Sequence, residues 1–157
     1  MSIRIRKAKY SDLPDIILLL ADDEIGSKRE KYDEPLPQAY YDAFDLIDKD
    51  SNNWLMIAEL DDKIIGTLQL TFITYLTYQG GTRAQIEGVR TDRSFRGRGI
   101  GKALVEWAIN KSKEKGCHLV QLTTDKRRPK ALAFYTKSGF VASHEGLKLK
   151  IGENEVE

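Results

Sequence analysis

The stretch RSFRGRGIGKAL, residues 93–104, decides the fold class of this chain, because it places three glycines and four basic side chains in twelve positions. Its glycines stand at every second position, whereas a dinucleotide-binding turn needs the spacing GxGxxG. A Walker A loop needs glycine where Arg96 stands and serine or threonine where Ala103 stands. An RNA-binding RGG segment is repeated and disordered, whereas this stretch occurs once and leads into an amphipathic pattern. These three nucleotide-binding interpretations are therefore excluded.

A strand, a glycine-rich turn and a helix start remain as the interpretation of this stretch. Residues 82–91 before it predict a strand, and apolar residues from Ile100 to Ala108 recur at the spacing of one buried helical face. Such a turn directs free main-chain N–H groups to one point, where the helix dipole adds positive potential. The side chains of Arg96, Arg98 and Lys102 add full charges there. The stretch therefore predicts a pyrophosphate site.

The rest of the chain predicts an α/β (α+β) fold, a single domain over residues 1–157 with a mixed, mostly antiparallel sheet. About seven strands are expected, at 2–8, 53–60, 64–77, 82–91, 118–124, 140–145 and 147–151. About four helices are expected, at 12–21, 38–50, 100–115 and 129–138. The last two strands would form a hairpin around Gly146, and residues 151–157 would form a frayed tail.

The composition, 41% hydrophobic and 31% charged residues, is that of an ordinary soluble domain. No apolar run approaches the roughly 20 residues that span a bilayer, and the first ten residues lack the apolar core of a signal peptide, so we expect a cytoplasmic protein without a membrane partner. Cys117 is alone and is expected to pack in the interior. His118 and His144 have no partner at ligand spacing, so no metal site is predicted.

The net charge of +1 argues against a nucleic-acid partner, but the charge is unevenly distributed. Residues 11–62 hold fifteen Asp or Glu against four Lys or Arg, and residues 93–130 hold eleven Lys or Arg against three Asp or Glu. Two solvated faces of different sign would explain this pattern. An anionic ligand on the second half and a cationic one near the first would explain it as well.

Two segments resemble the signatures of the GNAT N-acetyltransferase superfamily. RGRGIG, residues 96–101, is similar to its acetyl-coenzyme A signature, an Arg or Gln followed by x-x-G-x-G. ALAFYTKSGF, residues 131–140, is similar to its C-terminal helix signature, in which an aromatic–Tyr pair precedes Gly-Phe. The resemblance covers residues 53–150 and implies the GNAT fold with acetyl-coenzyme A as co-substrate.

The resemblance also implies how the co-substrate is held. The pyrophosphate would bind to the main chain of the turn, formed by Arg96, Gly97, Arg98, Gly99, Ile100, Gly101 and Lys102. The pantetheine arm would pair with Val89 and Thr91, and Tyr135 would face the thioester sulfur. The family often has asparagine three residues before the alanine at 131. Here Arg128 stands in that place, where it can meet a phosphate instead.

Acetyl transfer also needs a base for the amine and an acid for the departing thiolate. Glu87 is the candidate base, because it is expected to be partly buried in a strand two residues before Val89; an ion pair with Arg83 or Arg90 is the alternative. Gly88 permits a bulge that would separate this strand from the next. The phenol of Tyr135, with an ordinary pKa of about 10, can protonate a thiolate whose pKa is about 8.5.

The acceptor pocket is expected to be formed by the loop at 22–37 and the long hairpin. Candidate side chains that would attract an amine are Asp22, Asp23, Glu24, Tyr32 and Gln69. Arg29 would bind a carboxylate if the acceptor were an amino acid. These residues favour a small-molecule amine (an amino acid, a polyamine or an aminoglycoside) as acceptor.

Two other functions stay open. A protein Lys or N-terminal acetyltransferase would need an open groove. A non-catalytic coenzyme A-binding sensor would not need Tyr135 and Glu87. A homodimer is common among similar proteins, but no residue pattern predicts one here.

Overall fold

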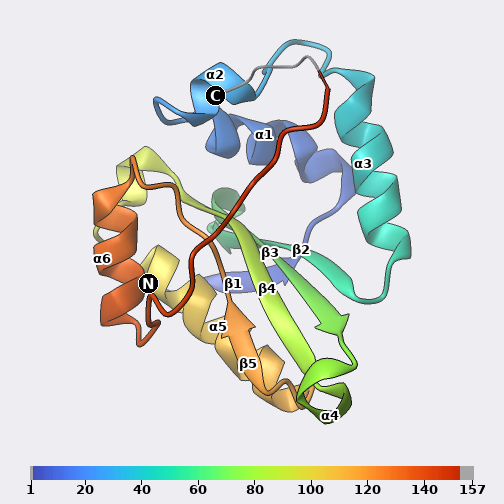
Figure 1. Ribbon diagram of the computed structural model, residues 1–157. Helices are drawn as coiled ribbons and strands as arrows, with labels where there is room; N and C mark the ends of the chain where they lie inside the picture. Colours follow the sequence, from blue (N-terminus) through green and yellow to red (C-terminus); the bar gives the residue numbers. More distant parts are fainter. Residues whose placement is uncertain (1, 153–157) are drawn as a thin grey trace.

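A single five-stranded sheet organises the chain in a computed structural model that describes residues 2–152 (Figure 1). The strand order is β1-β2-β3-β4-β5, and each pair is antiparallel except β4 with β5. The strands span Arg4–Lys7 (β1), Asn53–Leu60 (β2), Lys63–Thr74 (β3), Thr82–Thr91 (β4) and Leu119–Gln121 (β5). The predicted class, a mixed and mostly antiparallel sheet with flanking helices, is confirmed.

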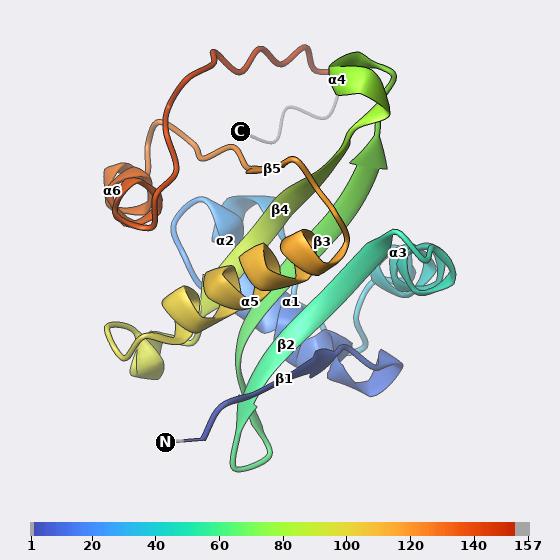
Figure 2. The ribbon, with the colours of Figure 1, turned by 90° about the horizontal axis from the view of Figure 1, so that it is seen from below.

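The helices cover both faces of this sheet. They span Leu13–Ala21 (α1), Gly26–Arg29 (α2), Gln38–Lys49 (α3), Thr77–Gly80 (α4), Ile100–Glu114 (α5) and Pro129–Lys137 (α6), with short 3₁₀ turns at Tyr10–Asp12 and Arg93–Phe95. Helices α1 and α3 lie on one face and α5 lies on the other, as the view from below shows (Figure 2). Within residues 2–152, no helix is both long and apolar enough to cross a membrane.

The apolar core forms two layers, one on each face of the sheet. On the α5 face, Leu68 and Leu70 of β3 pack against Ile100 and Leu104, and all four are almost fully buried. On the other face, the apolar side of α1 packs with Phe44 of α3 and residues of β2. The helical face predicted from Ile100 onward is therefore confirmed, because its apolar residues point into the first layer.

The predicted number of strands is wrong, because the hairpin expected at 140–145 and 147–151 does not form. Residues 141–150 have no helix or strand, so the described part of the sheet has five strands rather than about seven. The alternating pattern is present, but no strand within residues 2–152 pairs with it. Helices α2 and α4, of four residues each, add to the four helices expected. Most of the frayed tail predicted at 151–157 lies outside the described residues.

Strands β4 and β5 pair over only a short distance. Arg83–Gln85 of β4 pairs with Leu119–Gln121, and the remainder of β4 extends beyond the end of this ladder. Gly88 has a φ of +61°, and the register with β3 is irregular between Thr67 and Gln69, opposite this glycine. The predicted bulge at Gly88 is confirmed, and the second half of β4 has a free main-chain edge toward β5.

Candidate functional site

The glycine turn has the conformation that an anion-binding loop needs. Gly97 and Gly99 have φ values of +75° and +83°, and a Cβ atom at either would meet no atom within 4 Å. Backbone conformation, and not close packing, therefore requires glycine at both positions. Helix α5 begins at Ile100, directly after Gly99, which has no side chain to cap it. The main-chain amides of the first turn are thus free to bind an anion.

The basic side chains of the turn differ in how firmly they are held. Arg96 donates from Nη2 to the main-chain oxygen of Asp22 at 3.1 Å and from Nε to that of Thr91 at 3.4 Å. Arg98 lies over the ring of Phe95, 5.3 Å from its centroid, and is exposed. Arg96 therefore attaches the turn to the loop that follows α1, while Arg98 faces solvent.

The free edge of β4 runs toward this turn. Thr91 pairs with Gly66 of β3, and its Oγ1 lies 3.6 Å from the position that a Cβ of Gly101 would occupy. Val89 packs against the core on the α5 face. Since the ladder with β5 ends at Gln85, the main chain beyond it can pair with an extended ligand as an added strand would. The structure thus brings Val89, Thr91 and the turn to one continuous surface.

Asp23 links this surface to α6 through two arginines. Arg128 donates two hydrogen bonds to its carboxylate, Nη1 to Oδ2 at 2.8 Å and Nη2 to Oδ1 at 3.1 Å. Arg90 Nε lies 3.3 Å from the same Oδ2, and the main-chain N–H of Gly26 donates to Oδ1. Burial alone raises the pKa of Asp23, but the bonds from Gly26 and Arg128 outweigh it and lower that pKa. Asp23 is therefore a carboxylate at neutral pH.

The bulge at Gly88 determines which side chains of β4 lie on the same face of the sheet. Strict alternation would place Glu87 and Arg90 on opposite faces, because they are three residues apart. Their partners across the ladder are Gln69 and Thr67, which share one face of β3. Glu87 and Arg90 therefore lie on the same face. Sequence analysis missed Arg90 as a site residue, and the glycine that permits the bulge was the signal that could have indicated it.

Tyr135 lies close to these charges. Burial raises the pKa of its phenol, Arg90 and Arg128 act to lower it, and Glu87 acts in the same direction as burial. The net result is a pKa above the ordinary value, so the phenol is protonated at neutral pH. Its ring packs against Phe140, with centroids 5.8 Å apart. Tyr135 is thus a hydrogen-bond donor held beside two arginines and a carboxylate.

Glu87 is exposed, so the partial burial expected for it is wrong. The reason is that the ladder between β4 and β5 ends at Gln85, two residues earlier, and leaves this part of the strand open. Its Oε1 accepts a hydrogen bond from Gln85 Nε2 at 3.2 Å. Within residues 2–152, Arg90 pairs with Asp23 rather than with Glu87, and Arg83 lies over the ring of Tyr75.

Only some of the predicted acceptor residues line a common cleft. A cleft of about 410 Å³ is lined by Asp23, Glu24, Ile25, Lys28, Arg127 and Arg128. Asp22, beside this cleft in sequence, pairs with Arg93 at 2.7 Å and with Arg96 at 3.3 Å.

Three predicted acceptor residues lie outside the lining of this cleft. Arg29 pairs with Glu30 at 3.2 Å, Tyr32 contacts Glu34 at 3.5 Å, and Gln69 donates to Asn53 at 2.8 Å. The cleft therefore combines the loop after α1 with the start of α6, and not with the hairpin as expected.

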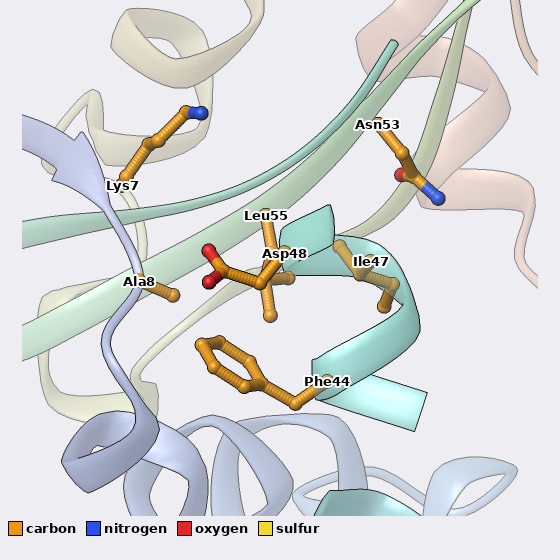
Figure 3. Close-up of a pocket in the computed structure, with 7 residues that line it drawn as sticks. All are labelled: Lys7, Ala8, Phe44, Ile47, Asp48, Asn53 and Leu55. Atoms are coloured by element: carbon orange, nitrogen blue, oxygen red, sulfur yellow. The ribbon is translucent and has the colours of Figure 1, made fainter. Parts of the chain in front are cut away.

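A second hollow lies between α3 and strands β1 and β2 (Figure 3). Its volume is about 10 Å³, which holds about one water molecule. It is lined by Lys7, Ala8, Phe44, Ile47, Asp48, Asn53 and Leu55. This hollow is too small for an acceptor, so the cleft beside Arg128 is the better candidate.

Comparison with known proteins identifies the family to which the chain is similar. A family model described as the acetyltransferase (GNAT) family matches residues 17–140. A crystal structure of a protein named as a transcriptional regulator from Bacillus halodurans C-125 is 56% identical, with a TM-score of 0.93, over 96% of this chain and 100% of that one.

Two curated relatives are named by the molecules they acetylate. Glucosamine 6-phosphate N-acetyltransferase of Trypanosoma brucei brucei is 36% identical over 89 residues, 57% of this chain and 58% of its own length. Aminoalkylphosphonate N-acetyltransferase of Salmonella typhimurium is 27% identical over 107 residues, 68% of this chain and 69% of its own length. The chain thus spans less than three fifths of the length of the trypanosomal relative.

Proposed function

Since the chain belongs to the acetyltransferase (GNAT) family, we propose that it transfers the acetyl group of acetyl-coenzyme A to the primary amine of a small molecule. The observation that carries the proposal is the convergence of the glycine turn, the free edge of β4 and the protonated Tyr135 on one surface. We keep the cytoplasm as the place of action, because the lone Cys117 fits a reducing compartment.

The donor would be held mainly by the main chain. The free amides of the first turn of α5 fit the pyrophosphate, because the helix dipole favours negative charge there. Arg98 and Lys102 are exposed beside these amides and add positive charge. The edge of β4 at Val89 and Thr91 fits the amide-bearing pantetheine arm as an added strand.

The transfer is direct in this proposal, with both substrates bound together. The amine nitrogen attacks the thioester carbonyl, so a C–N bond forms, and the C–S bond breaks as the tetrahedral intermediate collapses. Glu87 takes the proton that the amine loses, directly or through a water molecule, and Tyr135 gives a proton to the departing thiolate. A main-chain N–H near Val89 would stabilise the oxyanion.

Charge at the site favours an acceptor that carries a phosphate or phosphonate. Asp22 and Asp23, which we expected to attract a cationic acceptor, are each paired with two arginines. Arg90 and Arg128 share Asp23 as their ion-pair partner, so a bound phosphate would meet two guanidinium groups that have one carboxylate between them. The two curated relatives are named for amines with a phosphate or a phosphonate, and this supports the same class here.

The test is release of coenzyme A thiol with matched pairs of acceptors. Glucosamine 6-phosphate is compared with glucosamine, and 2-aminoethylphosphonate with ethanolamine; spermidine, an aminoglycoside and a lysine peptide complete the panel. We expect kcat/KM at least about tenfold higher for the phosphorylated member, the effect of one charge-assisted contact. Equal values within each pair would remove the anionic class but leave acetyl transfer in place.

Glu87→Gln tests the base separately. A general base must be ionised to act, so kcat/KM should rise with pH in the parent enzyme, and this rise should flatten in the variant. Glu114→Gln, the same change at an exposed position near the end of α5 where the side chain pairs with Lys111, serves as the control. An unchanged profile in Glu87→Gln would show that another group accepts the proton.

A non-catalytic coenzyme A-binding regulator is the second candidate. The name of the Bacillus halodurans protein, at 56% identity, favours it. This candidate predicts tight binding of acetyl-coenzyme A with no thiol release above background for any acceptor of the panel.

A further inference from the structure

The free edge of β4 is formed by the main-chain groups of two residues, Val89 and Thr91. The N–H of Asp92 donates toward β3, to the carbonyl of Ile65 at 2.8 Å. Main-chain groups alternate between the two sides of an antiparallel strand, so those of Arg90 also point toward β3. The N–H and C=O groups of Val89 and Thr91 therefore point away from β3, to the side where the pantetheine arm is proposed to pair.

Arginine side chains of this chain occupy both carbonyls of the free edge. Arg90 donates from Nη1 to the main-chain oxygen of Val89 at 2.8 Å, and Arg96 donates from Nε to that of Thr91 at 3.4 Å. The first distance is that of an ordinary hydrogen bond and the second is long. A ligand that pairs as an added strand donates its own N–H groups to such carbonyls. The pantetheine arm would therefore compete with Arg90 for the oxygen of Val89.

The side chain of Arg90 also lies next to the acceptor cleft. It is 16% exposed, and its Nε lies 3.3 Å from Oδ2 of Asp23, the carboxylate that Arg128 binds with two hydrogen bonds. Asp23 and Arg128 line the cleft of about 410 Å³, whereas Arg90 is not among its lining residues. In this structure Arg90 therefore reaches the cleft only through Asp23.

Displacement from Val89 would leave Arg90 without enough acceptors. A guanidinium has five N–H groups, and the buried Nε of Arg90 already makes no hydrogen bond within residues 2–152. The two oxygens of Asp23 already accept hydrogen bonds from Arg128 and from the main chain of Gly26. Because an unpaired and mostly buried charged donor costs free energy, the displaced guanidinium would bind an anion that enters the cleft.

We propose that Arg90 is a specificity-determining residue with two alternative partners: the carbonyl of Val89, and the phosphate or phosphonate of the acceptor once the pantetheine arm has taken that carbonyl. This inference rests on the proposed function. The arm of the donor thus completes the anion site of the acceptor. Since coupling between two binding sites is reciprocal, the acceptor tightens the binding of the donor by the same factor.

Titration calorimetry of the parent protein tests this coupling without any transfer reaction. Glucosamine 6-phosphate and 2-aminoethylphosphonate are the probes, each titrated into the protein alone, with saturating coenzyme A, and with saturating 3′-phospho-ADP. The last compound keeps the pyrophosphate but lacks the pantetheine arm. Coenzyme A should lower the Kd of a probe about tenfold, the effect of one charge-assisted contact, and 3′-phospho-ADP by less than about twofold. Equal values in all three titrations, or equal tightening by both nucleotides, would overturn the proposal.

A variant assigns the coupling to Arg90. Arg90→Gln, with its fold checked by circular dichroism, should lose the tenfold difference, whereas Lys126→Gln, which removes a charge at an exposed position, should keep it. A difference that persists in Arg90→Gln would contradict the proposal. The comparison of the two nucleotides needs no variant, so it decides the matter even if Arg90→Gln does not fold.

Failure of this inference can be told apart from failure of the proposed function. Release of coenzyme A thiol with a phosphorylated amine, together with a Kd of the probe that does not depend on coenzyme A, would reject the role of Arg90 and keep the acetyltransferase. No binding of either probe to any form of the protein would reject both the role of Arg90 and the anionic class of acceptor.

Discussion

Two arginine–carboxylate clusters of this protein differ in how completely their guanidinium groups are hydrogen-bonded within the fold. In the first, Arg6 of β1 lies between two carboxylates: Nη1 donates to Asp12 Oδ2 at 2.7 Å, and Nε donates to Glu59 Oε2 at 2.9 Å. In the second, Asp23 lies between two arginines, Arg128 and Arg90. The Arg6 cluster lies at the edge strand β1, and the Asp23 cluster lies beside the cleft that Arg128 helps to line.

The hydrogen bonds of each arginine determine what its cluster can do. Arg6 donates from Nε to Glu59 and from Nη1 and Nη2 to Asp12, and the hydrogen bond with Asp12 is the main cause that raises the pKa of Arg6, against the effect of burial. Burial lowers the pKa of Arg90, and the like charge of Arg128 lowers it further. Arg90 Nε is buried and makes no hydrogen bond within the described residues, although Asp23 lies near it.

The guanidinium of Arg6 makes its hydrogen bonds within the fold, whereas Arg90 has a buried donor without a hydrogen bond and shares Asp23 with Arg128, so the second cluster can accept an anion. We therefore interpret the Arg6 cluster as structural and the Asp23 cluster as part of the acceptor site.

Arg6→Ala should have the largest effect, on stability. It leaves the buried Asp12 and the half-buried Glu59 without their shared partner, which should lower the free energy of unfolding by about 3 kcal/mol. Urea denaturation measures this loss. The kcat and KM of the folded fraction should stay near the parent values, and a specific loss of turnover would contradict the structural interpretation.

Arg128→Gln should lower activity much more than stability, the reverse of Arg6→Ala. We expect kcat/KM for a phosphorylated amine to fall about thirtyfold, or about 2 kcal/mol, while stability changes by less than about 1 kcal/mol. Lys126→Gln removes the same charge two residues away at an exposed position and is the matched control. If both variants lose activity equally, general charge and not this cluster attracts the acceptor.

Tyr135→Phe removes the proposed acid while keeping its ring contacts. Turnover should fall at least about tenfold, or about 1.4 kcal/mol, with little change in KM for acetyl-coenzyme A. Because burial raises the pKa of this phenol, the parent should also keep its turnover at moderately alkaline pH. Near-normal turnover of the variant would remove Tyr135 as the acid.

Acid should destabilise the protein through both clusters, and this is the smallest effect. The pKa values of Asp12 and Asp23 are lowered in the folded protein, where burial opposes but hydrogen bonds from Arg6 and from Gly26 prevail. Their contribution is present above the usual aspartate pKa of about 3.9 and is lost as pH falls through the folded values. The midpoint temperature of unfolding should therefore decrease as the pH is lowered below about 4. This decrease should be less steep in Asp12→Asn and in Asp23→Asn.

Local pattern was enough to predict much of the fold. Glycine spacing and the apolar period of residues 100–108 predicted the turn and the helix start, because backbone conformation and helical period depend on near neighbours in the chain. The same reasoning failed at residues 140–151. Alternation there indicates a strand, but whether a strand forms depends on a neighbouring edge, which the segment itself does not contain.

Short contiguous stretches were therefore enough to predict the strand–turn–helix unit at residues 82–114, the family and the expected co-substrate. The contact of Asp23 with Arg90 and Arg128, the exposure of Glu87 and the lack of a strand at residues 141–150 became visible only in the folded chain. Ion pairs between residues up to 105 positions apart, the reversal of faces at the Gly88 bulge and the short ladder of β5 arise from packing of distant segments. No local pattern of amino acids specifies such contacts.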